Sequence, residues 1–263
     1  MNSERSSILI TNDDGYSSKG LKILLHIIRK NFNNIWVVAP NKNQSAKSQS
    51  ITINKFISVN KIKKNIFSIS GTPTDCIILG INKIFSDKNK PKLILSGINE
   101  GVNLGLDLLY SGTVSAAREG SINGVRSIAL SVDKVNKKSI DWRSVRYFAP
   151  KIIRSILTLK IDNEIFYNIN FPSISNELVK GIKIVNLGYR KPGTKIISKK
   201  ERSIYKYKIP SDRKILVDAK EGEDEYEFKK GYITISLHTY KNLIFSNKEI
   251  KKYKKMLRKV IEK

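Results

Sequence analysis

The opening forty residues constrain the fold most, because they alternate short apolar runs with a helical pattern. The run Ser7 to Thr11 is β-rich and apolar at its centre, and it ends in the turn sequence Asn12-Asp13-Asp14-Gly15. Leucine and isoleucine then recur at helical spacing over residues 18–30. A second apolar run, Trp36 to Ala39, stops at Pro40. A strand, a helix and a strand in this order predict an α/β fold with a parallel sheet. Its sites are expected at the carboxyl ends of the strands.

The rest of the chain continues this alternation. We expect further strands near residues 66–70, 93–95, 127–131, 166–171, 182–187 and 231–237, and helices near 72–85, 113–122 and 142–157. Apolar residues alternate with polar ones from Ile51 to Val59, and this pattern predicts a half-exposed hairpin.

The C-terminal part of the chain has a different character. Residues 188–230 are polar and irregular, and they are too many for a plain loop, so a β-rich extension is expected. A capping box at Ser246-Asn247-Lys248-Glu249 predicts a terminal helix. The chain thus divides into a core of residues 1–187, an extension of 188–245 and a terminal helix of 246–263.

The composition limits the partners and the compartment. Among 263 residues, 49 Lys and Arg against 23 Asp and Glu give a net charge of +26, which would attract polyanions. The lysines recur throughout the chain and gather on no single helix face, which favours dispersed surface charge without specific nucleic-acid binding. The single Cys76 excludes an internal disulfide and indicates a reducing, cytoplasmic location. No run approaches the roughly 18 apolar residues of a membrane span, and no signal peptide is expected.

Asp13 and Asp14 are the sharpest chemical signal. Neighbouring carboxylates point to opposite faces within a strand, but they can converge where the strand ends and the chain turns on Gly15. Two carboxylates make a hard oxygen site that suits Mg²⁺ or Mn²⁺. The alternative is an Asx-turn with an N-cap for the following helix.

Three other segments are expected to form a crevice together with the two aspartates. The polar stretches 39–45 and 96–103 follow two other strands, so they share one edge of a parallel sheet with the two aspartates. Ser111, Gly112 and Thr113 open a helix, where N–H groups and the helix dipole favour a phosphate. The alternative for Ser-Gly-Thr is an ordinary N-cap.

Several common catalytic arrangements are absent from the sequence. The chain has no Walker motif and no G-x-S-x-G elbow, and its two histidines are too few for a histidine-rich zinc site. A water activated by a metal ion is the nucleophile that suits this inventory best.

Ordered motifs over residues 8–131 resemble the SurE family of metal-dependent 5′-nucleotidases. The matching stretches are 8–15, 37–40, 45–52, 71–76, 96–103 and 111–120. The resemblance implies a Rossmann-like core with a β-rich arm that is exchanged in homodimers or homotetramers. It also implies hydrolysis of nucleoside 5′-monophosphates with one divalent ion, Mg²⁺ or Mn²⁺, per subunit. Near the end, Ser236-Leu237-His238 replaces the family's Thr-Pro-Leu-His, so no role is carried over to His238.

The resemblance also implies the roles of individual residues. The family's metal ligands fall on Asp13, Asp14, Ser45 and Asn99. Its substrate-contacting residues fall on Asn103, Ser111, Gly112 and Thr113.

The sequence therefore predicts a cytoplasmic phosphomonoesterase in which Asp13 and Asp14 are catalytic, and Asp14 is favoured over Asp13 for moving a proton. 3′-nucleotides and short polyphosphate remain open as substrates. A non-catalytic nucleotide- or nucleic-acid-binding protein on the same fold is the alternative.

Overall fold

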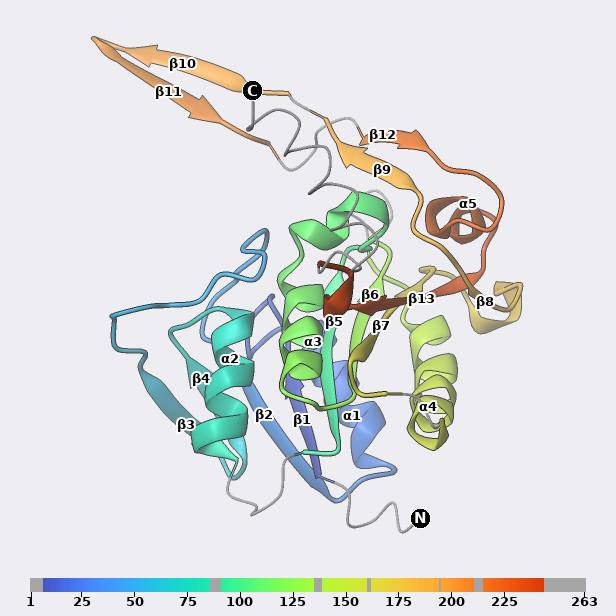
Figure 1. The fold of residues 1–263 in the computed structure, drawn as a ribbon. Helices are drawn as coiled ribbons and strands as arrows, with labels where there is room; N and C mark the ends of the chain where they lie inside the picture. The colour runs from blue at the N-terminus through green and yellow to red at the C-terminus, as the bar shows by residue number, and fades with distance from the viewer. Residues whose placement is uncertain are drawn as a thin grey trace, which may run out of the picture.

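A nine-stranded, mostly parallel sheet forms the centre of the molecule in the computed structural model (Figure 1). The structure describes residues 7–85, 91–134, 139–159, 162–193, 195–210 and 215–243. The order of strands across the sheet is β3-β4-β2-β1-β5-β6-β7-β13-β8. The strands of this sheet are β1 (Ser7–Thr11), β2 (Asn34–Pro40), β3 (Val59–Lys63), β4 (Ile66–Ile69), β5 (Leu93–Glu100), β6 (Ser127–Val132), β7 (Ile165–Phe171), β8 (Ile182–Ile184) and β13 (Ile233–Thr239).

Helices cover both faces of the sheet, because successive side chains of the buried strands point to opposite sides. Ile8 and Ile10 of β1 pack toward α1 and α4, whereas Leu9 packs toward α2. The helical elements are α1 (Lys19–Arg29), α2 (Pro73–Leu79), η2 (Gly80–Ile84), η3 (Gly105–Leu109), α3 (Gly112–Ile122), α4 (Arg143–Thr158), η5 (Asn176–Leu178), α5 (Asp224–Lys229) and η6 (Tyr240–Leu243). The predicted α/β fold with a mostly parallel sheet and flanking helices is confirmed. No helix within the described ranges is both long and apolar enough to cross a bilayer.

The hairpin expected at residues 51–59 is wrong. The hairpin lies one step later, between β3 and β4, which pair antiparallel. Thr52 makes no strand contact, because its N–H and hydroxyl donate to the Asp75 carboxylate at 3.0 and 2.7 Å. Asp75 also completes the predicted start of α2, where it forms a capping box with Thr72. The segment with the apolar alternation is therefore mostly exposed and is hydrogen-bonded to the first turn of α2.

Two other strand limits differ from the prediction. β5 continues to Glu100, so residues 96–100 belong to the strand after an irregularity in its pairing with β6. β8 is short and ends at Ile184.

The polar C-terminal region contains four further strands outside the main sheet. β9 (Tyr189–Pro192) pairs with β12 (Ile215–Asp218), and β10 (Ile197–Glu201) pairs with β11 (Ile204–Lys208). The β10–β11 hairpin projects from the body of the molecule (Figure 1). β13 returns to the main sheet and pairs antiparallel with β7. The predicted terminal helix of residues 246–263 lies outside the described residues, and the three-part division of the chain stays a prediction.

Candidate active site

The turn after β1 is built by residues other than the two aspartates. Asn12 Oδ1 accepts from Gly15 N at 3.2 Å, and Asn12 Nδ2 donates to Gly15 O and to Ser18 Oγ at 3.0 and 2.8 Å. Ser18 caps α1, because its hydroxyl accepts from Leu21 N at 3.3 Å. Asn12 forms the Asx-turn and Ser18 forms the cap, so the Asp13 and Asp14 carboxylates perform neither task.

The Asp13 side chain is buried at the carboxyl end of β1. Asp13 is 4% exposed, and its Oδ1 accepts from the Thr113 hydroxyl at 2.6 Å. Its main-chain carbonyl accepts from Gln44 N at 2.7 Å, which holds the loop after β2 against this turn. Burial raises the pKa of Asp13, because desolvation disfavours the charged carboxylate, while the hydrogen bond from Thr113 acts in the opposite direction.

Asp14 lies between the loop after β2 and the end of β5. Its Oδ1 accepts from Asn43 Nδ2 and its Oδ2 accepts from Glu100 N, both at 3.3 Å. Burial, followed by the charge of Asp13, raises the pKa of Asp14 to about 6. The Lys134 charge offsets only part of this effect. Two neighbouring carboxylates with so little compensating positive charge form an environment that favours a bound cation.

Asn99 lies near the carboxyl end of β5, and Ser45 lies in the loop after β2. Asn99 Nδ2 donates to Gly101 O at 2.7 Å, which leaves the amide oxygen as the group available to an electrophile. Ser45 is exposed, and its N–H donates to Asn43 Oδ1 at 2.9 Å, in the side chain that also contacts Asp14.

The donor chemistry of these residues fits a hard divalent cation. Within the described segments, no three or more His, Cys, Asp or Glu residues come together as a metal cluster. A cation here would rely on the carboxylates of Asp13 and Asp14 together with the neutral oxygens of Ser45 and Asn99. An all-oxygen set suits Mg²⁺ or Mn²⁺. The joint role of these four residues as ligands stays a prediction.

The N-terminus of α3 packs directly against Asp13. A Cβ added to Gly112 would lie 2.9 Å from Asp13 Cβ and 3.0 Å from Pro73 Cγ, so only glycine allows this approach. Ser111 caps the helix, because its hydroxyl accepts from Val114 N at 3.1 Å. The hydroxyl proton of Ser111 stays available for donation. The N-cap alternative for Ser-Gly-Thr is therefore right as local structure, and the same cap places a helix N-terminus beside the carboxylate.

Thr113 and Asn103 point into contacts within the protein. The Thr113 hydroxyl proton is used in the bond to Asp13. Asn103 is 6% exposed, and its Nδ2 donates to Ser131 Oγ at 2.7 Å. Its N–H donates to Asn170 Oδ1 at 2.8 Å. The substrate-binding roles of Asn103, Ser111, Gly112 and Thr113 stay predictions.

Two residues that contact Asp14 were not predicted from the sequence. Asn43 and Glu100 lie in the expected polar stretches, but their contacts with Asp14 depend on tertiary placement. Asn12 forms the Asx-turn that the turn sequence had offered as an alternative.

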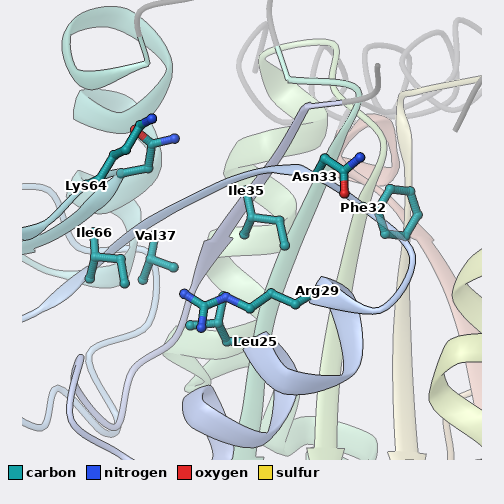
Figure 2. Close-up of a pocket in the computed structure, with 9 residues that line it drawn as sticks. Leu25, Arg29, Phe32, Asn33, Ile35, Val37, Lys64 and Ile66 are labelled. Carbon is teal, nitrogen blue, oxygen red and sulfur yellow. The ribbon is translucent and has the colours of Figure 1, made fainter. Parts of the chain in front are cut away.

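A separate cavity of about 460 Å³ lies at the amino ends of β2 and β4, beside the end of α1 (Figure 2). Leu25, Ile35 and Ile66 form apolar parts of its wall, and Arg29 and Lys64 lie beside them. None of the predicted site residues lines this cavity.

Comparison with known proteins gives a consistent family. The family model described as Survival protein SurE matches residues 8–194. The "5′-nucleotidase SurE" of Paramagnetospirillum magneticum is 43% identical over 192 residues, which cover 73% of this chain and 74% of that protein. The protein of the same name from a Chelativorans species is 32% identical over 232 residues, or 87% of this chain and 91% of that protein.

A solved structure extends the likeness to nearly the whole chain. The crystal structure of the SurE protein from Aquifex aeolicus matches with a TM-score of 0.80 and 32% identity. The match covers 96% of this chain and 99% of that one. On its sequence motifs, its family-model match and its fold, this chain belongs to the SurE family.

Proposed function

We propose that this protein hydrolyses nucleoside 5′-monophosphates to nucleoside and phosphate with the help of a divalent cation. The chain is a 5′-nucleotidase by its family and by its curated relatives, which carry the name 5′-nucleotidase SurE. The observation that carries the mechanism is the contact between Asp13 and the N-terminus of α3. It supports the proposal, because the buried Asp13 carboxylate lies against a helix N-terminus, and helix N-termini favour phosphate.

The cation is proposed to be one Mg²⁺ or Mn²⁺ per subunit, held by Asp13, Asp14, Ser45 and Asn99. When bound, it supplies Lewis-acid polarisation of the phosphoryl group and a water of lowered pKa. Without a cation, two carboxylates would repel the phosphate electrostatically, so the same geometry argues against a metal-free reaction.

The remaining roles follow from the surroundings of each side chain. Ser111 would donate its hydroxyl proton to a phosphate oxygen, and the N-terminal dipole of α3 would stabilise the negative charge. Thr113 would orient Asp13. Asp14 is the better proton carrier of the two aspartates, because it is only partly buried and so lies nearer to solvent than Asp13 does.

The substrate range is tested with a panel of compounds and a phosphate-release assay. The panel contains 5′-, 3′- and 2′-deoxy nucleoside monophosphates and tripolyphosphate, each assayed with Mg²⁺, Mn²⁺ or EDTA. We expect release from 5′-monophosphates, and 3′-nucleotides and short polyphosphate are secondary candidates. Tight nucleotide binding without phosphate release under any of these conditions would favour a non-catalytic nucleotide-binding protein.

We also propose a homodimer or homotetramer in which the extension of residues 188–245 is exchanged between subunits. The projecting β10–β11 hairpin supports this, because it exposes Ile204, Tyr205 and Tyr207, side chains that usually become buried in an interface. Light scattering at micromolar concentration should give a dimer or larger, and deletion of residues 195–210 should shift it toward monomer. A wild-type monomer would contradict the proposal.

A cytoplasmic location and the absence of a specific nucleic-acid partner complete the proposal. The lone Cys76, which is buried and unpaired, supports a reducing compartment. Dispersed lysines predict only weak DNA binding that disappears at physiological salt, and a filter-binding salt titration measures it.

A further inference from the structure

Arg190 joins the C-terminal extension to the body of the molecule through two short ion pairs. It lies on β9, and its side chain is 13% exposed. Its Nε lies 2.6 Å from Asp107 Oδ2, and its Nη1 lies 2.7 Å from Glu225 Oε2. One guanidinium therefore connects β9 with η3 and with α5, using different donors of its planar fork for each carboxylate.

Asp107 carries this connection to the start of α3. Its main-chain carbonyl accepts from Tyr110 N at 3.0 Å and from Ser111 N at 3.1 Å. Ser111 is the N-cap of α3 and the proposed phosphate contact. The side chain of Asp107 is thus held by Arg190, while its carbonyl holds the main chain of the phosphate-binding cap.

The main chains at this junction are packed too closely for η3 to move independently of β9. A Cβ added to Gly105 would lie 2.6 Å from Arg190 Cβ and 2.7 Å from Arg190 N. Asp224, which is 1% exposed, accepts from Gly105 N at 2.7 Å and from Gly188 N at 2.9 Å. A shift at the root of the extension would therefore be transmitted to residues 105–111.

We propose that Arg190 is a positioning residue for the phosphate site, acting through Asp107 to fix the main chain of Ser111. This inference rests on the proposed function and deepens it. Arg190 does not touch the substrate; it sets the place of the groups that do. A charge-assisted pair that is mostly buried suits this task, because its loss leaves a carboxylate without its partner and frees the turn.

The test uses the full-length protein loaded with Mn²⁺, a nucleoside 5′-monophosphate as substrate and inorganic phosphate as competing inhibitor. Arg190→Ala and Asp107→Ala should each raise KM and the Ki of phosphate by about fivefold or more, because both report on the same cap. The double variant should raise the phosphate Ki no further than the more severe of the two single variants does, since the two residues act as one unit. Asp107→Asn keeps an oxygen that can accept from Arg190 Nε, so it should restore the phosphate Ki to within about twofold of wild type.

Glu225→Ala is the matched control. It removes the other carboxylate from Arg190 but leaves the Asp107 pair intact, so it should lower Tm without changing the phosphate Ki. If the alanine variants do not fold, Arg190→Lys replaces them. It keeps the charge without the fork and should raise the phosphate Ki by about threefold.

Three results would overturn the inference. The first is an active wild type whose phosphate Ki stays the same in Arg190→Ala and Asp107→Ala, or in Arg190→Lys where that variant replaces them. The second is a Glu225→Ala variant that raises the phosphate Ki as strongly as Asp107→Ala does. A wild type that releases no phosphate from any nucleotide would instead contradict the proposed function, and the inference with it.

Discussion

The Thr113 hydroxyl donates a 2.6 Å hydrogen bond to Oδ1 of Asp13, a residue 100 positions earlier in the chain. This bond joins the end of β1 to the first turn of α3, and it keeps a buried carboxylate oriented where water cannot do so. The bond therefore fixes the Asp13 carboxylate against the N-terminus of α3, where Gly112 also packs closely against Asp13.

Removing that contact should change the pH dependence of activity. The Thr113 hydrogen bond lowers the pKa of Asp13 against the effect of burial, so its loss raises the pKa further. In Thr113→Val the acid limb of kcat/KM should move to higher pH by about half a unit or more. Thr113→Ser keeps the hydroxyl and should overlay the wild-type profile. Identical acid limbs in Thr113→Val and wild type would show that Asp13 does not depend on this bond.

Asp13→Asn should separate catalysis from folding. The substitution removes a negative charge and preserves volume, so we expect kcat to fall by about a hundredfold or more, equivalent to about 2.7 kcal/mol. Tm should stay near the wild-type value or rise, because a buried carboxylate is costly. Phosphate release and thermal unfolding on the same preparation make the comparison. A variant that keeps its activity but loses stability would assign Asp13 a structural role.

Asp14 should make the metal-free protein less stable as the pH rises. Its pKa is about 6 in the folded protein against 3.8 ordinarily, so the folded state holds more protons between about pH 4 and 6. The free energy of unfolding therefore falls as the pH rises through this window. In EDTA, Asp14→Asn should match wild type near pH 4 and exceed it in Tm at pH 8. Adding Mn²⁺ at pH 8 should stabilise wild type only. A Tm difference that does not change with pH would rule this out.

His238 should remain neutral across the working pH range. Its Nε2 lies 2.8 Å from Ser236 Oγ, and burial, aided by the Arg118 charge, lowers its pKa to about 4. Because the unfolded value is about 6.5, the imidazole contributes stability above that pH, and this contribution is lost as the pH falls toward 4. An NMR titration of the ring should give a midpoint near 4, and a midpoint near 6.5 would refute the prediction.

The sequence was sufficient for the sheet and for the position of the two aspartates. Strong strand and helix patterns placed most elements of the main sheet and its flanking helices within a few residues. The apolar alternation near Ile51 failed, because Thr52 and Asp75 bond to each other across 23 positions. Patterns of local hydrophobicity contain no information on such distant side-chain pairs.

The details of the site were less accessible than its location. The motifs predicted that Asp13, Asn99 and Ser111 lie at the carboxyl ends of the parallel strands. They did not show that Thr113 bonds to Asp13. They also did not show that Arg190 bonds to Asp107. Both contacts depend on how α3 and the C-terminal extension pack onto the sheet. Hydrogen-bond partners of buried polar groups are set by tertiary structure, which the spacing of residues along the chain does not encode.

The most direct test of the central claim is phosphate release from a nucleoside 5′-monophosphate by rigorously metal-free protein, measured while Mn²⁺ or Mg²⁺ is added back. The account predicts no turnover without a cation and saturable recovery in wild type. It also predicts that recovery is lost in both Asp13→Asn and Asp14→Asn, while Thr113→Ser recovers as wild type does. Full activity in the metal-free protein, or full recovery in Asp13→Asn, would contradict it.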